Sequence, residues 1–288
     1  MSSGETIAAW PSRIRDESEV PEIFADAFRA VELHEGGFPL VLYSPAFRFD
    51  RYLEPATLLV RAGDRLTCLT WRRGRATTQS LKLGDVYRVE RGTELLHSWI
   101  AFHAHGPSGH SSVRADFNTM GLGLYLPLLR ELRTELYPVP GSGANASTTF
   151  DHLATVNFKF MNLARESLEP GVEARAFVLQ NVVRVRLLRL FDKVVIPASM
   201  AIATQQELIL IREGDAQSHE YYGATWTYVR LDRLERISVF PLERGQALVM
   251  EAVLPGKERV RAEFELAKDA ELRALVACVQ GSHPSIRD

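Results

Sequence analysis

The chain has 288 residues, of which 46% are hydrophobic and 24% are charged, and its formal net charge at pH 7 is −2. This length and composition predict a globular protein with room for two domains, and they exclude the disordered and collagen-like classes. The small net charge argues against binding to nucleic acid through a broad basic surface, so we expect no nucleic-acid partner.

Cysteine content and the N-terminal sequence indicate the compartment. The two cysteines, Cys68 and Cys278, predict no disulfide framework and therefore a cytoplasmic protein. The first residues lack the basic start and apolar core of a secretory signal. No uncharged apolar run approaches the roughly 20 residues that span a bilayer, so we expect no transmembrane segment. Peripheral association with a membrane is the alternative.

The first half of the chain reads as a helix, a series of strands and a second helix. Ser18 is the expected cap of a helix that begins near Glu19 and ends at the glycines 36–37. A helix with apolar residues three or four apart, among them Leu129, is expected to begin after Gly123, which keeps Pro127 in its first turn. Between these helices, strands are predicted at 39–43, 56–61, 66–71, 77–83, 86–90, 95–103 and 111–118, with a loop at 44–55.

The second half has the same pattern of predicted elements. A linker rich in glycine, proline and serine at 138–147 precedes a helix at 151–168. A C-terminal helix is expected to begin with Asp269 as its cap and to bury Leu272, Leu275, Val276 and Val279. Strands are predicted at 174–179, 182–190, 199–204, 208–212, 226–231, 235–240, 247–253 and 260–266.

Two short segments recur in the same order. FDRYLEPA at 49–56 returns as FDKVVIPA at 191–198, and VRADFN at 113–118 returns as VRAEFE at 260–265. The spacing between copies changes only by loop-sized amounts, as it does in structural repeats. We therefore expect a duplicated module of a helix, about seven short strands and a helix.

The module resembles the pleckstrin-homology (PH) and GRAM-like fold, in which seven strands precede one amphipathic helix. The segments 203–214 (ATQQELILIREG) and 222–239 (YGATWTYVRLDRLERISV) resemble the core of bacterial PH-like domains, and 80–89 (SLKLGDVYRV) matches more loosely. The resemblance implies a mainly β (α+β) protein, similar to uncharacterised bacterial tandem PH-like proteins. Its two PH/GRAM-like modules are expected to be partly open seven-stranded β-barrels, each with a preceding helix and a C-terminal capping helix.

The same resemblance implies the domain boundaries. A mobile N-terminus and leading helix are expected at 1–37, and the first PH-like domain at 38–137. The linker and second leading helix occupy 138–171. The second PH-like domain spans 172–280, and a C-terminal tail follows at 281–288.

The repeated FD…PA element carries the first candidate binding site. PH domains hold phosphoinositide head groups between their first two strands with a cluster of cations, although the family's K-x(n)-[KR]-x-R pattern is not clearly present. Asp50 and Asp192 also neutralise their neighbours. In the alternative interpretation the element is structural, with Phe as a plug and Pro-Ala as the start of a strand. The candidate cations are Arg48, Arg51, Arg184, Arg186, Arg189 and Lys193.

Two further groups of residues are candidate binding sites. The hairpin tip 71–75 (WRRGR), with Lys82, suits either anionic lipid head groups or a solvated turn whose tryptophan packs inward. Four histidines lie close in sequence, and His103 and His105 are expected to share one face of a strand. Because no cysteine or glutamate with tight ligand spacing accompanies them, no metal site is predicted. The histidines are His97, His103, His105 and His110.

The sequence lacks the phosphate-binding, nucleotide-binding, hydrolase and metalloprotease motifs. We therefore expect a protein that is not an enzyme and has no cofactor. The leading function is a scaffold that binds a protein partner or another copy of itself through its PH-like domains. The alternative is peripheral binding of anionic lipid head groups, and a more distant one is an enzyme with a cleft between its domains.

Overall fold

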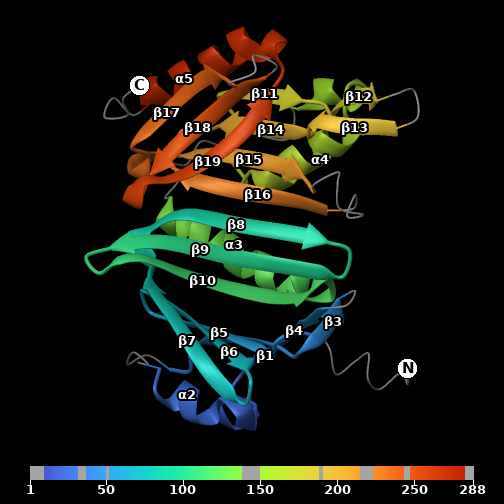
Figure 1. The fold of residues 1–288 in the computed structure, drawn as a ribbon. Coiled ribbons are helices and arrows are strands. Elements are labelled where there is room, and N and C mark those ends of the chain that lie inside the picture. The colour runs from blue at the N-terminus through green and yellow to red at the C-terminus, as the bar shows by residue number, and fades with distance from the viewer. Residues whose placement is uncertain are drawn as a thin grey trace. The chain divides into compact units, whose positions relative to one another are not determined.

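The structure is a computed structural model, which describes residues 10–31, 37–49, 52–137, 150–187, 191–214, 223–242 and 247–282 (Figure 1). The described part is mainly β, with several antiparallel sheets, none of which closes into a barrel within these ranges. The chain divides into two compact units, unit 1 at Met1–Leu136 and unit 2 at Tyr137–Asp288. No described helix has both the length and the apolar character that crossing a bilayer requires.

The first sheet of unit 1 is a row of neighbouring antiparallel strands. Gly63 (φ 56°) and Gly74 (φ 78°) adopt the left-handed backbone that its two tight hairpin turns require. The strand order is β1 (Ser12–Ile14), β2 (Leu40–Ser44), β5 (Thr57–Ala62), β6 (Arg65–Arg72) and β7 (Arg75–Lys82).

The leading helix is shorter than predicted. It consists of the 3₁₀ turns η1 (Glu17–Glu19) and η2 (Glu22–Phe24), followed by α2 (Ala25–Arg29). The first turn is capped by Asp16, whose Oδ1 accepts a hydrogen bond from the backbone N of Ser18 at 2.9 Å, so Ser18 is not the cap. Val20 is extended because it precedes Pro21, and this breaks the helix. The predicted end at the glycines 36–37 lies largely outside the described residues.

The leading helix still buries an apolar face. Phe24 and Phe28 pack on the first sheet against Val41, Leu58 and Val60. These two phenylalanines are almost completely buried, so they close one side of the sheet with a hydrophobic layer.

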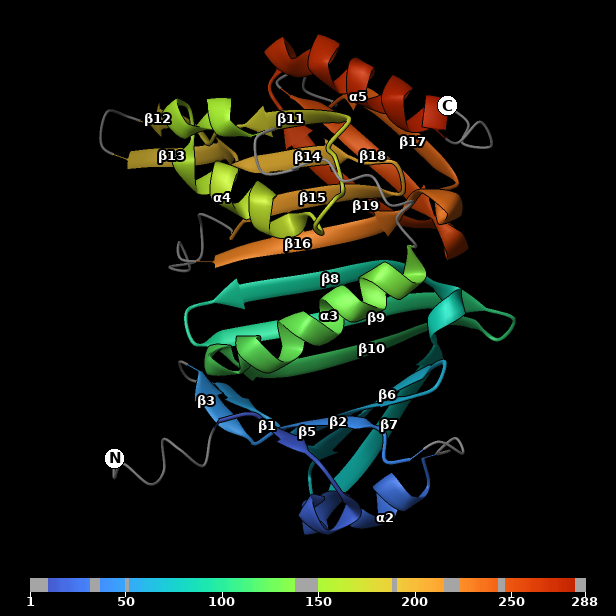
Figure 2. The ribbon, with the colours of Figure 1, turned by 180° about the vertical axis from the view of Figure 1, so that it is seen from behind.

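The second sheet of unit 1 has the order β8 (Val86–Glu94), β9 (His97–Gly106) and β10 (Gly109–Asn118), and it follows the 3₁₀ turn η3 (Leu83–Asp85). The helix α3 (Leu122–Leu136) crosses one face of this sheet (Figure 2). Its Tyr125 ring stacks on Phe117 at a centroid distance of 3.8 Å.

The start of α3 differs from the prediction. The 3₁₀ turn η4 (Thr119–Gly121) leads directly into α3 at Leu122, so Pro127 lies inside the helix and not in its first turn. Leu129 and Leu132 are buried as the apolar pattern predicts.

The first described elements of unit 2 are η6 (Asp151–Thr155) and α4 (Phe158–Ser167), and Asn157 caps α4. Trp226 Nε1 donates a hydrogen bond to the Leu163 carbonyl at 3.3 Å and so joins α4 to the first sheet. Neighbouring strands of this sheet are, in order, β16 (Gly223–Arg230), β15 (Glu207–Glu213), β14 (Ser199–Ala203) and β11 (Ala176–Gln180).

The second sheet of unit 2 precedes the last helix. The 3₁₀ turn η7 (Leu231–Arg233) leads into β17 (Arg236–Pro241), β18 (Leu248–Leu254) and β19 (Glu258–Phe264), with η8 (Pro255–Lys257) before β19. After η9 (Leu266–Lys268), α5 (Asp269–Ser282) packs on β11 and β17. The stripe Leu272, Leu275, Val276 and Val279 is buried, as predicted.

The predicted cap of α5 is wrong. Asp269 is the first helical residue, with helical backbone angles, and its carboxylate pairs with Arg273 at 2.9 Å one turn later. An aspartate in the first turn also interacts favourably with the helix dipole, which explains why this residue type occurs at this position.

The FD…PA segments form part of hairpins that the sequence did not predict. In unit 1, β3 (Phe47–Phe49) pairs with β4 (Tyr52–Glu54), where we expected a loop. In unit 2, β12 (Val183–Leu187) pairs with β13 (Phe191–Ile196). The strands β2–β10 and β11–β19 therefore follow one order, and β2-β5-β6-β7 corresponds to β11-β14-β15-β16. The PH-like domain boundaries stay a prediction.

Candidate functional site

Of the cations predicted at the FD…PA element, Arg48, Arg184 and Lys193 have described side chains. Arg48 on β3 and Lys193 on β13 are exposed. Arg51 and Arg189 lie outside the described residues, and the side chain of Arg186 is not described.

The hairpin of unit 2 separates two of these cations. Arg184 is opposite Val194, whereas Lys193 is opposite Val185. Neighbouring residues of a strand point to opposite faces, so Arg184 and Lys193 lie on different faces of the hairpin.

The Pro-Ala step at the end of the element borders a groove in unit 1, here called the unit 1 groove. The hairpin tip 71–75, a candidate site from the sequence, forms one wall of the groove, and its Arg72 and Arg73 are exposed. Trp71 turns inward, with its ring 6.3 Å from that of Phe24. The groove has a volume of about 540 Å³ and is lined by Ala46, Leu53, Glu54, Pro55, Ala56, Trp71, Arg72 and Arg73.

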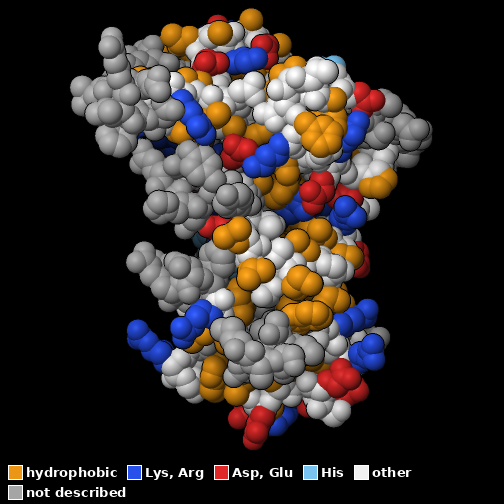
Figure 3. All heavy atoms as spheres, turned by 90° about the vertical axis from the view of Figure 1, so that its right-hand side faces the viewer, with side chains coloured by type: hydrophobic (Ala, Val, Ile, Leu, Met, Phe, Trp, Pro, Cys, Tyr) orange, Lys and Arg blue, Asp and Glu red, His pale blue; other side chains and the backbone are white. Residues whose placement is uncertain are grey.

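Hydrophobic side chains reach the surface beside this groove. Leu53 of β4 is 67% exposed. Figure 3 views the molecule from the side of the β3–β4 hairpin and shows hydrophobic side chains interspersed with cationic and acidic ones. Scattered apolar side chains of this kind are normal on protein surfaces, so the mixture by itself identifies no binding site.

The equivalent step of unit 2, Pro197-Ala198, borders a second groove, here called the unit 2 groove. Its volume is about 490 Å³, and it opens between the ends of the two sheets. It is lined by Pro197, Ser199, Arg212, Glu213, Gly214, Thr225, Phe240, Leu242, Val249, Arg261, Ala262 and Glu263.

The wall of the unit 2 groove contains a buried hydroxyl group. Ser199 is 2% exposed, and its Oγ has no hydrogen-bond partner among the described residues. A buried polar atom without a partner costs about 1–3 kcal/mol, which a ligand can recover by bonding to it. Ser199 Oγ is therefore the atom of the groove that has a hydrogen bond to gain from a ligand.

Two of the charged residues that line the unit 2 groove form ion pairs with residues outside it. Glu213 pairs with Lys159 at 2.8 Å, and Arg261 pairs with Glu251 at 2.6 Å. Phe240 and Leu242, at 36% and 39% exposure, leave an apolar surface at the opening. The groove therefore suits an apolar group more than a free ion.

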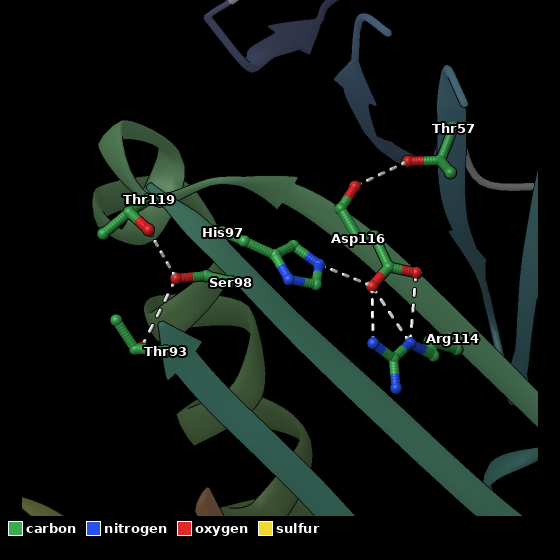
Figure 4. Close-up of polar contacts among 7 residues, drawn as sticks. All are labelled: Thr57, Thr93, His97, Ser98, Arg114, Asp116 and Thr119. Carbon is green, nitrogen blue, oxygen red and sulfur yellow. Dashed lines mark hydrogen bonds and ion pairs between the residues drawn. The ribbon is translucent and has the colours of Figure 1, made fainter. Parts of the chain in front are cut away.

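A second site lies on the β8–β9–β10 sheet of unit 1 (Figure 4). His97 Nε2 is 3.0 Å from Asp116 Oδ1, and Arg114 donates to the same carboxylate from Nη2 at 2.7 Å and from Nε at 3.1 Å. His97 and Asp116 come from neighbouring strands, β9 and β10. The backbone carbonyl of Asp116 also accepts a hydrogen bond from Thr57 Oγ1 at 3.3 Å.

An indole ring supports this polar group. Trp99 lies directly opposite Asp116 in the register, with its ring 5.3 Å from the His97 ring and 5.0 Å from the Arg114 guanidinium carbon. This distance permits a cation–π contact. A Cβ added at Gly92 would lie 1.9 Å from Trp99 Cζ2, so only glycine lets the ring cross β8.

The electrostatics of Asp116 follow from these contacts. Burial by itself raises the pKa of this carboxyl, but the hydrogen bonds from His97 and Arg114 and their positive charge outweigh burial and hold the pKa below its ordinary value. Asp116 is therefore a carboxylate at neutral pH.

The four histidines do not converge on one point. As predicted, His103 and His105 share a face of β9, where His105 lies opposite His110. His110 Nδ1 is 3.1 Å from Tyr87 Oη, and His103 Nε2 is 3.5 Å from Glu90. Within the described ranges, potential metal ligands come together at Glu54, His97 and Asp116, whose ligand atoms all lie within 4.8 Å of one another.

Sequence reasoning missed Glu54 and Asp116 as site residues. Asp116 belongs to the repeated VRADFN segment, which was used only to recognise the repeat. Its position has an acid in both copies, since VRAEFE carries Glu263 there, and that shared acid was the available signal. Glu54 carries no comparable signal, because only the register and packing bring β4 close to β9.

Three arginines surround one carboxylate in unit 2, and sequence reasoning missed this group as well. Glu251 of β18 is 2% exposed and lies 3.6 Å from Arg236, 3.4 Å from Arg259 and 2.6 Å from Arg261. The signal was the alternation Arg259-Val260-Arg261, which places two arginines on one face of a strand. Because three cations share one anion, this arginine cluster has excess positive charge.

A scan against protein-family models found no match to this chain, and a search of curated proteins found none either.

Proposed function

We propose that this chain is a non-catalytic binding protein of two duplicated PH-like domains, and that its unit 2 groove binds an extended apolar segment of a partner protein. The PH-like assignment is supported by the common order of strands and the terminal helix in the two units. It is also supported by FD…PA, which ends directly before the corresponding strands β5 and β14, and by VRA(D/E)F, which lies on β10 and β19.

The observation that carries the binding proposal is the groove at the Pro-Ala step of each unit. Pro55 and Pro197 occupy the same position of the repeated element, and each lines a groove of several hundred Å³. The two grooves share this step and the end of the second strand after it in sequence, and the unit 2 groove extends further over β17, β18 and β19. The unit 2 groove is the better binding site because Ser199 offers a hydroxyl without a partner.

The chemistry of the groove selects the ligand. Apolar side chains of the partner contact Phe240 and Leu242 at the opening, where their burial stabilises the complex by about 1.5–3 kcal/mol for each large side chain. A main-chain group of the partner bonds to Ser199 Oγ. An extended peptide presents both kinds of group in alternation, whereas a soluble ion presents neither apolar part.

A selected peptide tests this proposal. Random peptides displayed on phage are selected on the full chain, and the affinity of the best peptide is measured by fluorescence anisotropy. Phe240→Ser removes an apolar contact, so we expect its affinity to fall at least about tenfold, equivalent to about 1.4 kcal/mol. Ser199→Ala is expected to weaken the same peptide.

The matched control is Leu266→Ser, which removes another exposed apolar side chain of unit 2 outside the groove. It should leave peptide affinity unchanged. Circular dichroism verifies that each variant is folded. If no peptide is enriched, or if the selected peptide binds Phe240→Ser as tightly as the parent chain, the proposal is wrong.

The arginine cluster around Glu251 favours a second candidate function, the binding of anionic lipid head groups. Arg236, Arg259 and Arg261 are each about half exposed, so their remaining N–H groups face solvent. Sedimentation with phosphatidylserine vesicles that is lost in high salt, together with failure of the peptide selection, would favour lipid over a protein partner.

A further inference from the structure

The three residues Glu54, His97 and Asp116 converge from three strands of unit 1. Glu54 is the last residue of β4, His97 the first of β9, and Asp116 lies near the end of β10. Their ligand atoms lie within 4.8 Å of one another, although the residues are far apart in sequence. The fold thus brings together one imidazole and two carboxylates.

The imidazole is held in place before any ligand arrives. His97 is 9% exposed, with its ring 6.0 Å from Phe47 and 5.3 Å from Trp99. Its Nε2 is 3.0 Å from Asp116 Oδ1, close to the roughly 3.3 Å that separates two ligand atoms of one tetrahedral zinc ion. The pair of His97 and Asp116 therefore needs little rearrangement to bind one metal ion.

The charges in the cluster are not balanced within the described residues. Arg114 neutralises Asp116 through its two-point contact. No described cation pairs with Glu54, whose carboxylate lies close to that of Asp116. Two carboxylates so close repel each other, and a divalent cation between them removes the repulsion.

We infer that Glu54, His97 and Asp116 bind one divalent transition-metal ion of the zinc type. An imidazole nitrogen with two carboxylate oxygens favours such an ion over Mg²⁺ or Ca²⁺, which prefer oxygen alone. The ion replaces the proton between His97 and Asp116, and that proton leaves to solvent. Arg114 stays on Asp116 as an outer hydrogen-bond partner that orients the ligand.

The partial exposure of Glu54 gives the ion a route to the site. Glu54 also lines the unit 1 groove, which opens to solvent. A change of its side-chain rotamer brings the carboxylate to the ion, while His97 and Asp116 remain fixed. The site is thus a partly exposed one in which solvent completes the coordination.

Zinc titration of the full chain tests the inference. The purified chain is freed of metal with a chelator, and Zn²⁺ alone is titrated by isothermal calorimetry. We expect one Zn²⁺ per chain, loss of binding in His97→Ala and at least about tenfold weaker binding in Glu54→Gln. Co²⁺ in place of Zn²⁺ should give a visible absorption band that both variants reduce.

Two controls keep the outcome clear. Glu54→Gln alters a partly exposed side chain, so it keeps the test valid even if His97→Ala fails to fold. His110→Ala removes a histidine outside the cluster and should bind Zn²⁺ as the parent chain does. The inference is overturned if the parent chain binds no Zn²⁺, or if His110→Ala abolishes binding while Glu54→Gln does not.

Discussion

Gly92 is the residue that permits the aromatic support under the polar site of unit 1. Trp99 of β9 crosses the neighbouring strand where Gly92 has no side chain, and this holds the ring near both His97 and Arg114. Any larger residue forces the indole away, because a Cβ would lie 1.9 Å from the Trp99 ring. The glycine is therefore required by close approach and not by a turn.

This argument predicts the effect of Gly92→Ala. Because Trp99 must move, we expect the free energy of unfolding to fall by about 1–3 kcal/mol, measured by urea denaturation, with a shift in tryptophan fluorescence. The matched control is Gly123→Ala in α3, where nothing lies within 4 Å of the added Cβ. There alanine should raise stability by about 0.5–1 kcal/mol. Equal stability of the two variants would refute the close-approach argument.

The burial of individual residues could be predicted where the periodicity of a single helix or strand decides which side chains face the core. Leu272 and Leu275 were predicted to be buried because residues three apart share a helix face. Glu54 and Asp116 were not predicted to meet, because their distance depends on which strands pair and in which register. A single sequence carries no direct record of that pairing.

At the scale of elements, the strands with clear apolar runs were predicted, whereas the β3–β4 and β12–β13 hairpins were not. The strands β3 and β4 are three residues long, FRF and YLE, which is too short for an alternating pattern to be distinguished from a loop. Only their mutual pairing makes them strands. The predicted length of the leading helix was wrong for another reason. Pro21 imposes an extended backbone on Val20, and this overrides the helical periodicity of the apolar residues.

The strand β18 carries an acid whose pKa is set by its neighbours. Burial alone raises the pKa of Glu251, but the hydrogen bond from Arg261 and the charges of Arg259 and Arg261 outweigh it, so the pKa lies below the ordinary value of 4.5. A carboxyl with a lowered pKa stabilises the fold above its ordinary pKa. That stabilisation is lost as pH falls through the lowered value.

We therefore expect Glu251→Gln to be less stable than the parent chain at neutral pH, where it leaves three arginines without their shared anion. The difference should shrink as the pH falls below the ordinary pKa of 4.5, because the unfolded parent chain then binds a proton at Glu251 that the folded chain binds only at lower pH. Urea denaturation at a series of pH values measures this. Glu263→Gln on β19 is the control for the loss of one carboxylate, and it should lower the stability at neutral pH much less than Glu251→Gln does. A pH-independent deficit in Glu251→Gln would contradict the electrostatic explanation.

At the scale of the whole molecule, two short matches carried most of the predictable information. FD…PA ends directly before β5 in unit 1 and directly before β14 in unit 2, and VRA(D/E)F lies on β10 and on β19, so the two matches mark corresponding places in each unit. The order of strands followed from them. The pairing into two sheets and a hairpin per unit did not, since it depends on long-range contacts that repeats do not encode.

The terminal helices should each maintain the unit to which they belong. Leu129 of α3 is 2% exposed and Leu275 of α5 is fully buried. An aspartate at either position places an unpaired charge in an apolar core, which costs more than about 4 kcal/mol. We therefore expect Leu129→Asp to unfold unit 1 and Leu275→Asp to unfold unit 2. Hydrogen exchange followed by mass spectrometry assigns the loss of protection to each unit.

Exposed positions of the same helices supply the controls for this pair. Thr134→Asp on α3 and Ala274→Asp on α5 introduce the same charge on solvated faces, so both should keep native protection throughout. The terminal helix α3 packs on β9 of unit 1, and α5 packs on β11 and β17 of unit 2. Losing a terminal helix therefore exposes the core of its own unit, while the other unit keeps its core. Native protection in Leu129→Asp and Leu275→Asp would show that the terminal helices do not maintain the units. Loss of protection in both units of either variant would show that the units fold as one.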